Sequence, residues 1–161
     1  MKYKATQNYR VPRLSRLVLS LALLISLGAC GGPKMGAEEQ LTQWVDDVQA
    51  AAEAKERRAI IKMISPAYKD AKGYDRDNID GKLRAYFFRQ SNIKLLTTVN
   101  EIRVFGESAA EIDLTVGMAG TNDGFLGFSA DAYKFQLELV LEGDDWLLIS
   151  ARWAELGEGL N

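Results

Sequence analysis

The spacing of the hydrophobic residues changes once along the chain, near residue 90, and this change limits the folds open to it. Before that point, apolar residues recur every three to four positions, as on one side of an amphipathic helix. The main stripe comprises Leu41, Trp44, Val45, Val48 and Ala52. After it, apolar and polar residues alternate with a period of two, as in strands, and no proline occurs from 67 to 161. The pattern predicts helices first and strands second, an α+β arrangement.

The helical part divides into three segments. Residues 37–64 are expected to form two helices joined by a bend in a polar stretch. The stretch 65–78 is rich in Asp, Gly and Tyr and is expected to form a loop. A third helix is expected from about Asn78 to Arg89, with Asp77 or Asn78 as its N-cap.

The second part predicts about four long strands in a meander. Apolar residues switch parity near Asn100, which indicates a β-bulge that bends the first strand. A hairpin turn is expected at Asn122-Asp123-Gly124. The segment Trp146–Trp153 is apolar on both parities at its start, which is typical of a central strand. We therefore expect three N-terminal helices packed on a curved antiparallel sheet.

The first thirty residues have the layout of a secretory signal peptide. Residues 1–16 contain five basic residues and no acid, and residues 17–27 are uncharged and mostly apolar. This apolar run is too short to cross a bilayer as a helix. The sequence Leu27-Gly28-Ala29-Cys30 that ends it resembles the lipobox of bacterial lipoproteins. The resemblance implies cleavage after Ala29 and an acylated Cys30.

These features predict three parts and a location. Residues 1–29 are expected to be a cleaved signal peptide, 30–36 a lipidated flexible tether, and 37–161 the folded domain. Gly31 resembles the residue that follows the lipidated cysteine in lipoproteins sorted to the outer membrane. The expected location is the bacterial cell envelope, anchored by lipid to the outer membrane and facing the periplasm. A secreted protein with an incidental cysteine, or an uncleaved anchor, remains the alternative.

Charge and composition exclude several kinds of chemistry. Without residues 1–29, the chain keeps 15 basic against 22 acidic residues, a net charge of −7, so nucleic acid is not an expected partner. The chain has no histidine, which excludes His-dependent triads and His-ligated metals. Its single cysteine excludes an intrachain disulfide and a thiolate cluster. We expect no cofactor.

Three segments resemble the nuclear transport factor 2-like superfamily, also called SnoaL-like or cystatin-like. They are Ser65–Asp70, the helix end Tyr86-Phe87, and the last strand Trp146–Trp153, within a match over about residues 37–155. The resemblance implies a cone-shaped α+β fold with a cavity between helices and sheet. Members of this superfamily include isomerases, cyclases and dehydratases, and also small envelope proteins whose activity is not established.

If that fold is correct, a few polar and aromatic residues lie on or beside the cavity rim. Asp70 and Tyr68 are of the types that a ketosteroid-isomerase-like site uses for acid–base chemistry. The wider set of predicted ligand contacts is Tyr68, Asp70, Tyr74, Arg84, Tyr86 and Trp153. The alternative is that these tyrosines close the cavity and that Asp70 makes a turn. Asp113 alternates out of phase with its apolar neighbours and is expected to face water.

No metal site is expected. The acidic run Asp75–Gly81 has Ile79 at the fifth position, where a calcium loop needs an oxygen ligand. Taken together, the sequence predicts a membrane-tethered module that binds a small apolar ligand or an envelope protein partner and performs no chemistry. The alternative is a SnoaL-like enzyme acting on a hydrophobic substrate. A homodimer through the outer sheet face is a third hypothesis.

Overall fold

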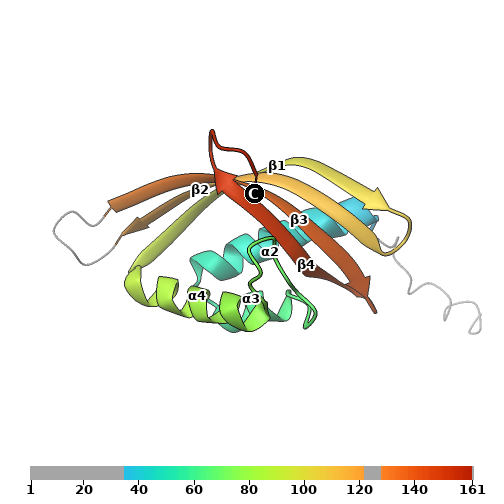
Figure 1. The fold of residues 1–161 in the computed structure, drawn as a ribbon, viewed down its shortest axis with the longest axis horizontal. Coiled ribbons are helices and arrows are strands. Elements are labelled where there is room, and N and C mark those ends of the chain that lie inside the picture. Colours follow the sequence, from blue (N-terminus) through green and yellow to red (C-terminus); the bar gives the residue numbers. More distant parts are fainter. Residues whose placement is uncertain (1–34, 122–127, 161) are drawn as a thin grey trace, which may run out of the picture. The chain divides into compact units, whose positions relative to one another are not determined.

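The computed structural model describes residues 35–121 and 128–160 as three helices and four strands. The predicted signal peptide at 1–29, Cys30, most of the tether (residues 30–34) and the predicted turn at 122–124 therefore lie outside the described residues. All three helices cover the same face of the curved sheet (Figure 1); we call this the inner face and the opposite one the outer face. The elements are α2 (Ala37–Glu53), α3 (Arg57–Lys62), α4 (Arg76–Arg89), β1 (Asn92–Phe105), β2 (Ala109–Thr121), β3 (Phe128–Glu142) and β4 (Asp145–Glu155).

The strands form an antiparallel meander in the order β1-β2-β3-β4. The register between β1 and β2 shifts between Val99 and Glu101, so the bulge predicted near Asn100 is confirmed. A second shift occurs between β3 and β4, where Glu138 pairs with Ser150 but Leu139 pairs with Leu148. Ile149 is therefore an extra residue in β4, and the side chains before and after it exchange faces.

The prediction that Trp146–Trp153 is a central strand is wrong, because β4 lies at the edge of the sheet. Two features explain its apolar character on both parities. Before the bulge at Ile149, even-numbered side chains such as Trp146 point into the core. After it, odd-numbered side chains such as Ala151 do so. The free side of the strand is also covered by another part of the chain.

That cover is the segment 63–71, which runs along β4 and bonds to its backbone. The amide of Leu148 donates to the carbonyl of Met63 at 3.0 Å, and the amide of Ser65 donates to the carbonyl of Leu148 at 2.9 Å. The amide of Lys69 donates to the carbonyl of Ile149 at 3.0 Å. These bonds satisfy groups that an edge strand would otherwise expose.

Helix α4 begins earlier than the sequence pattern suggested. Its N-cap is Asp75, not Asp77 or Asn78. The Asp75 carboxylate accepts from the amide of Asn78 at 2.9 Å, and the Asn78 side-chain oxygen accepts from the amide of Asp75 at 3.1 Å. This reciprocal pair is a capping box, in which two N–H groups at the helix start find acceptors.

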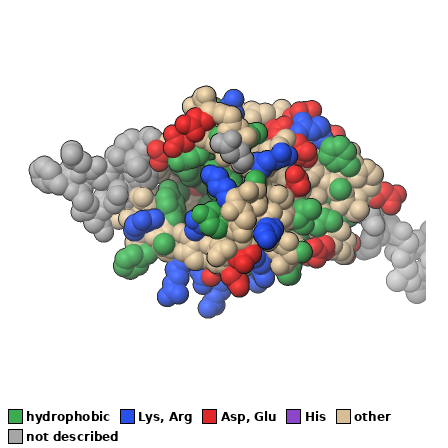
Figure 2. Space-filling view, in the orientation of Figure 1, with side chains coloured by type: hydrophobic (Ala, Val, Ile, Leu, Met, Phe, Trp, Pro, Cys, Tyr) green, Lys and Arg blue, Asp and Glu red, His purple; other side chains and the backbone are tan. Residues whose placement is uncertain are grey.

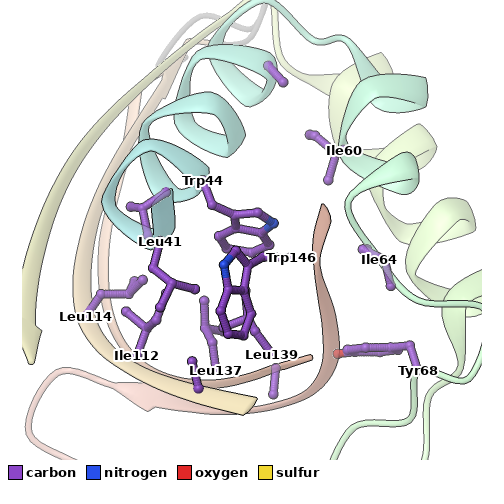
Figure 3. Packing of buried hydrophobic residues seen from close by; sticks show 14 residues of the cluster. Leu41, Trp44, Ile60, Ile64, Tyr68, Ile112, Leu114, Leu137, Leu139 and Trp146 are labelled. Atoms are coloured by element: carbon purple, nitrogen blue, oxygen red, sulfur yellow. The ribbon is translucent and has the colours of Figure 1, made fainter. Parts of the chain in front are cut away.

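The core lies between the helices and the inner face of the sheet. Leu41, Ile112 and Leu139 are fully buried there, and they belong to one cluster with both Trp44 and Trp146 (Figure 3). Strand alternation places Ile112 and Leu114 of β2 on this side, whereas Asp113 between them is on the outer face, as predicted.

Candidate functional site

Between the helices and the inner face of the sheet lies a partly open apolar cavity of about 280 Å³. Fifteen residues of the described part of the chain line it, and they come from all three helices and all four strands. Among them are Val48, Leu83, Leu95, Val116, Phe135 and Leu148. Ligand pockets in proteins commonly measure roughly 300–1,000 Å³, and this cavity lies at the lower limit of that range, so it suits only a small molecule.

No ionisable side chain is among the lining residues that the structure describes. The polar side chains that reach the cavity are Gln49 and Thr97, together with the indole of Trp44. Gln49 is turned toward β1, because its amide nitrogen donates to the carbonyl of Leu95 at 3.4 Å. The alternation of β1, β2 and β3 explains the composition, since their inward positions are apolar except for Thr97 and their charged residues point outward. The wall can bind an apolar molecule and offers it few polar contacts.

At one edge of the cavity, the side chain of Glu53 links the end of α2 to β1. The carboxylate of Glu53 accepts from the amide of Leu95 at 2.9 Å and from the ammonium of Lys94 at 3.0 Å. The backbone hydrogen bond, followed by the pairing with Lys94, lowers the pKa of Glu53 below its ordinary value of 4.5. The end of α2 is thus tied to the start of β1 next to a lining residue.

None of the six predicted ligand contacts is among the residues that line this cavity. Tyr68 and Asp70 are brought together, but in the segment that covers β4. Asp70 Oδ1 accepts from the amides of Lys72 and Tyr74 at 2.9 and 2.8 Å, so this carboxylate builds the loop. Asp70 Oδ2 is buried and has no hydrogen-bond partner among the described residues. Burial, and then the charge of Asp70, raises the pKa of Tyr68.

The other four predicted residues are scattered. The Tyr74 ring lies 4.0 Å from the ammonium of Lys82. Burial, and then the charge of Asp131, raises the pKa of Tyr86, which is half-buried on α4. Arg84 is exposed on the same helix, and Figure 2 shows Lys and Arg side chains along the edge where α3 and α4 lie.

Trp153 lines a second, polar hollow of about 300 Å³ near the end of β4. Its indole lies under the ammonium of Lys72, 4.4 Å from the ring centre. Glu155 and Tyr133 line the same hollow. A role for any of the six predicted residues in ligand contact stays a prediction.

The sequence does not single out the lining residues, because their spacing is that of an ordinary hydrophobic core. Val48 and Ala52 lie on the helical stripe of α2, and Leu114 and Val116 on the alternating side of β2. Periodicity shows that such side chains face inward but not whether they fill the space between the layers. No other signal in the sequence distinguishes a filled core from one with a cavity.

Two further properties concern metals and membranes. In the ranges 35–121 and 128–160, no group of three or more potential ligands is placed to hold a metal ion. None of the helices in the described part of the chain is long and apolar enough to span a bilayer.

No family model matches the sequence, and no curated protein matches it. Solved structures do match its fold. A provisionally assigned scytalone dehydratase from Novosphingobium aromaticivorans superposes with a TM-score of 0.67 at 9% identity, over 73% of this chain and 82% of that one. A ketosteroid isomerase-like protein from Erwinia carotovora atroseptica gives a TM-score of 0.61 at 11% identity, over 76% and 100% of the two chains.

A third match carries the name of the fold. It is a nuclear transport factor 2-like protein of unknown function in nutrient uptake from Rhodospirillum rubrum, with a TM-score of 0.57 and 16% identity, over 72% of this chain and 98% of that one. At such low identities the likeness extends to the fold and not to the activities in these names. The described part of this chain therefore has the nuclear transport factor 2-like, or cystatin-like, fold.

Proposed function

We propose that this protein binds a small apolar ligand in the inner-face cavity and performs no chemistry on it. The observation that carries the proposal is the lack of any ionisable side chain among the described lining residues. General acid–base catalysis needs such a group within hydrogen-bond distance of the reacting atoms. Burial of apolar ligand surface against this wall is favourable by itself.

Calorimetry on the purified full chain with diphenylmethane, a two-ring hydrocarbon, tests this proposal. We expect binding of one molecule per chain. Val116→Phe, which adds a ring to the cavity wall, should abolish it. Thr98→Phe places the same ring on an exposed position of β1 and should leave the affinity within about twofold. Binding that survives Val116→Phe unchanged, or no binding by the native chain, would overturn the proposal.

We also propose that lipid on Cys30 holds the domain on the periplasmic side of the outer membrane. The support is the sequence Leu27-Gly28-Ala29-Cys30 at the end of an apolar run, with the single cysteine of the chain at the position that acylation requires. Cys30→Ser should release the protein from the membrane fraction and abolish labelling by a fatty acid. A variant that stays bound and labelled would contradict the assignment.

A catalytic function is the second candidate, because Tyr68 lies close enough to the Asp70 carboxylate for that charge to raise its pKa, and Asp70 Oδ2 is buried without a partner by hydrogen-bond geometry among the described residues. Their place beside β4 and the bonds of Asp70 to its own loop favour a structural role. The test is isomerisation of a β,γ-unsaturated ketosteroid, followed by absorbance. Turnover that Asp70→Asn abolishes without unfolding the protein would support catalysis. Loss of stability in Asp70→Ala with unchanged diphenylmethane affinity would support the loop role.

A protein partner remains a third candidate, with a second copy of this chain docked on the outer sheet face as its simplest form. The apolar side chain of Leu96 is 75% exposed on β1 and supports this idea. Sedimentation velocity should show a dimer that Leu96→Lys dissociates. A native chain that sediments as a monomer at high concentration would remove this candidate.

A further inference from the structure

The two tryptophans of the core differ in one respect that bears on the ligand. Trp146 Nε1 donates to the side-chain oxygen of Gln40 at 3.1 Å. Trp44 Nε1 is also buried in the folded chain but donates to no described residue. The Trp44 side chain is 8% exposed and lines the cavity, whereas Trp146 does not line it. Figure 3 draws both indoles within the same buried cluster.

A buried indole N–H without an acceptor is unusual, because buried tryptophans normally find a partner. The nearby wall offers little to satisfy it. The lining residues with side-chain oxygens are Gln49 and Thr97, and Gln49 is already bonded to the backbone of β1. A trapped water would need two to four polar partners, more than this apolar surface supplies.

We infer that the ligand carries an uncharged hydrogen-bond acceptor, a carbonyl or ether oxygen, which accepts from Trp44 Nε1. The inference rests on the proposed function and specifies the chemical class of the ligand. A charged acceptor such as a carboxylate is disfavoured, because none of the described lining residues carries a positive charge that would compensate for its desolvation. The nitrogen is buried, so a small shift of the indole or of the side chains around it accompanies binding.

The ligand class therefore combines a mostly apolar body with one oxygen. The cavity volume of about 280 Å³ limits the body to roughly two rings or a short branched chain. Benzophenone and diphenylmethane form a matched pair of probes for this class. They share two phenyl rings and differ in having a carbonyl or a methylene group between them.

The test compares the affinities of the two probes for the full chain by calorimetry. We expect benzophenone to bind about fivefold more tightly than diphenylmethane, the gain of one neutral hydrogen bond. Trp44→Phe keeps an aromatic ring in the wall but removes the donor, so it should bring the two affinities within about twofold. Trp146→Phe removes an indole whose N–H already has a partner and should keep the preference.

A second readout does not depend on the variants folding identically. In the native chain, the indole N–H resonance of Trp44 should move downfield with benzophenone and not with diphenylmethane, while that of Trp146 stays in place. Equal binding of both probes with no selective shift would overturn the acceptor inference and leave cavity binding intact. A preference for benzophenone that persists in Trp44→Phe would also overturn it. Failure of both probes to bind would overturn the proposed function as well.

Discussion

The two faces of the sheet have opposite chemistry, although their residues alternate along the same strands. The inner face contributes apolar side chains such as Ile112, Leu114 and Leu137 to the core and the cavity. The outer face of the same strands carries a charged network. There Arg103 bonds to Glu111 and, at 2.9 Å, to Asp113.

This difference shows where the chain uses electrostatics. On the outer face, Arg103 also pairs with Glu101, and Gln136 donates to Glu111, so four residues of β1 and β2 and one of β3 are joined. These hydrogen bonds and charges raise the pKa of Arg103. The cavity wall has no such group among its described residues. Charged pairs thus join the strands on the outer face, whereas the inner face makes apolar contacts.

The largest expected effect comes from placing a charge on the inner face. Leu114→Lys buries an ammonium at a position that is 5% exposed, and no acid is among the described residues of the cavity wall. The free energy of unfolding should fall by about 3–5 kcal/mol. Urea unfolding followed by circular dichroism would measure the change.

The neighbouring position provides the matched control. Thr115→Lys puts the same charge on the outer face and loses the hydrogen bond between Asn100 and Thr115. Its cost should stay below about 1 kcal/mol. Similar losses in the two variants would show that the division between the faces is not energetically important.

A smaller effect is expected from breaking the outer network. Arg103→Met removes the cation and leaves Glu101, Glu111 and Asp113 close together without compensation. The melting temperature should fall by about 2–5 °C in dilute buffer, because the pairs are partly solvated. In 1 M NaCl, where the Debye length is about 3 Å, the difference should shrink. A loss that salt does not change would indicate packing of the arginine stem instead.

Much of the fold could be predicted from the sequence. Three helices, a four-strand antiparallel meander and the bulge near Asn100 all follow from the spacing of apolar residues. The edge position of β4 could not be predicted, since two features together give it the apolar pattern of a central strand. One is the bulge at Ile149, and the other is the cover of its edge by residues 63–71. Neither leaves a local pattern of its own.

The candidate site was less accessible to sequence reasoning. Tyr68 and Asp70 are predicted site residues because their side chains can act in acid–base chemistry. In the structure, however, the Asp70 carboxylate accepts hydrogen bonds from the turn that precedes α4. The cavity is built from residues such as Val48 and Val116 that have no distinctive chemistry. The N–H of Trp44 has no acceptor among the described residues. Whether a buried donor finds an acceptor depends on side chains from other elements, so it can be seen only in the three-dimensional structure.

The smallest expected effect concerns Glu53, the last residue of α2, which bonds to the start of β1. Its pKa is lowered in the folded protein, so the stability it contributes is present above its ordinary value of 4.5 and is lost as the pH falls through the lowered value. Glu53→Gln keeps an acceptor for the amide of Leu95 but loses the charge beside Lys94. At pH 7 the melting temperature should fall by about 1–3 °C.

The pH dependence separates this mechanism from a general effect of charge. The difference between the native chain and Glu53→Gln should be constant between pH 7 and about pH 5, and should shrink below 4.5 as the native carboxylate takes up a proton. Glu56→Gln removes a nearby charge whose side chain makes no capping hydrogen bond. The same profile in both variants would mean that the bonds to β1 are not the cause, and that the end of α2 is held by packing alone.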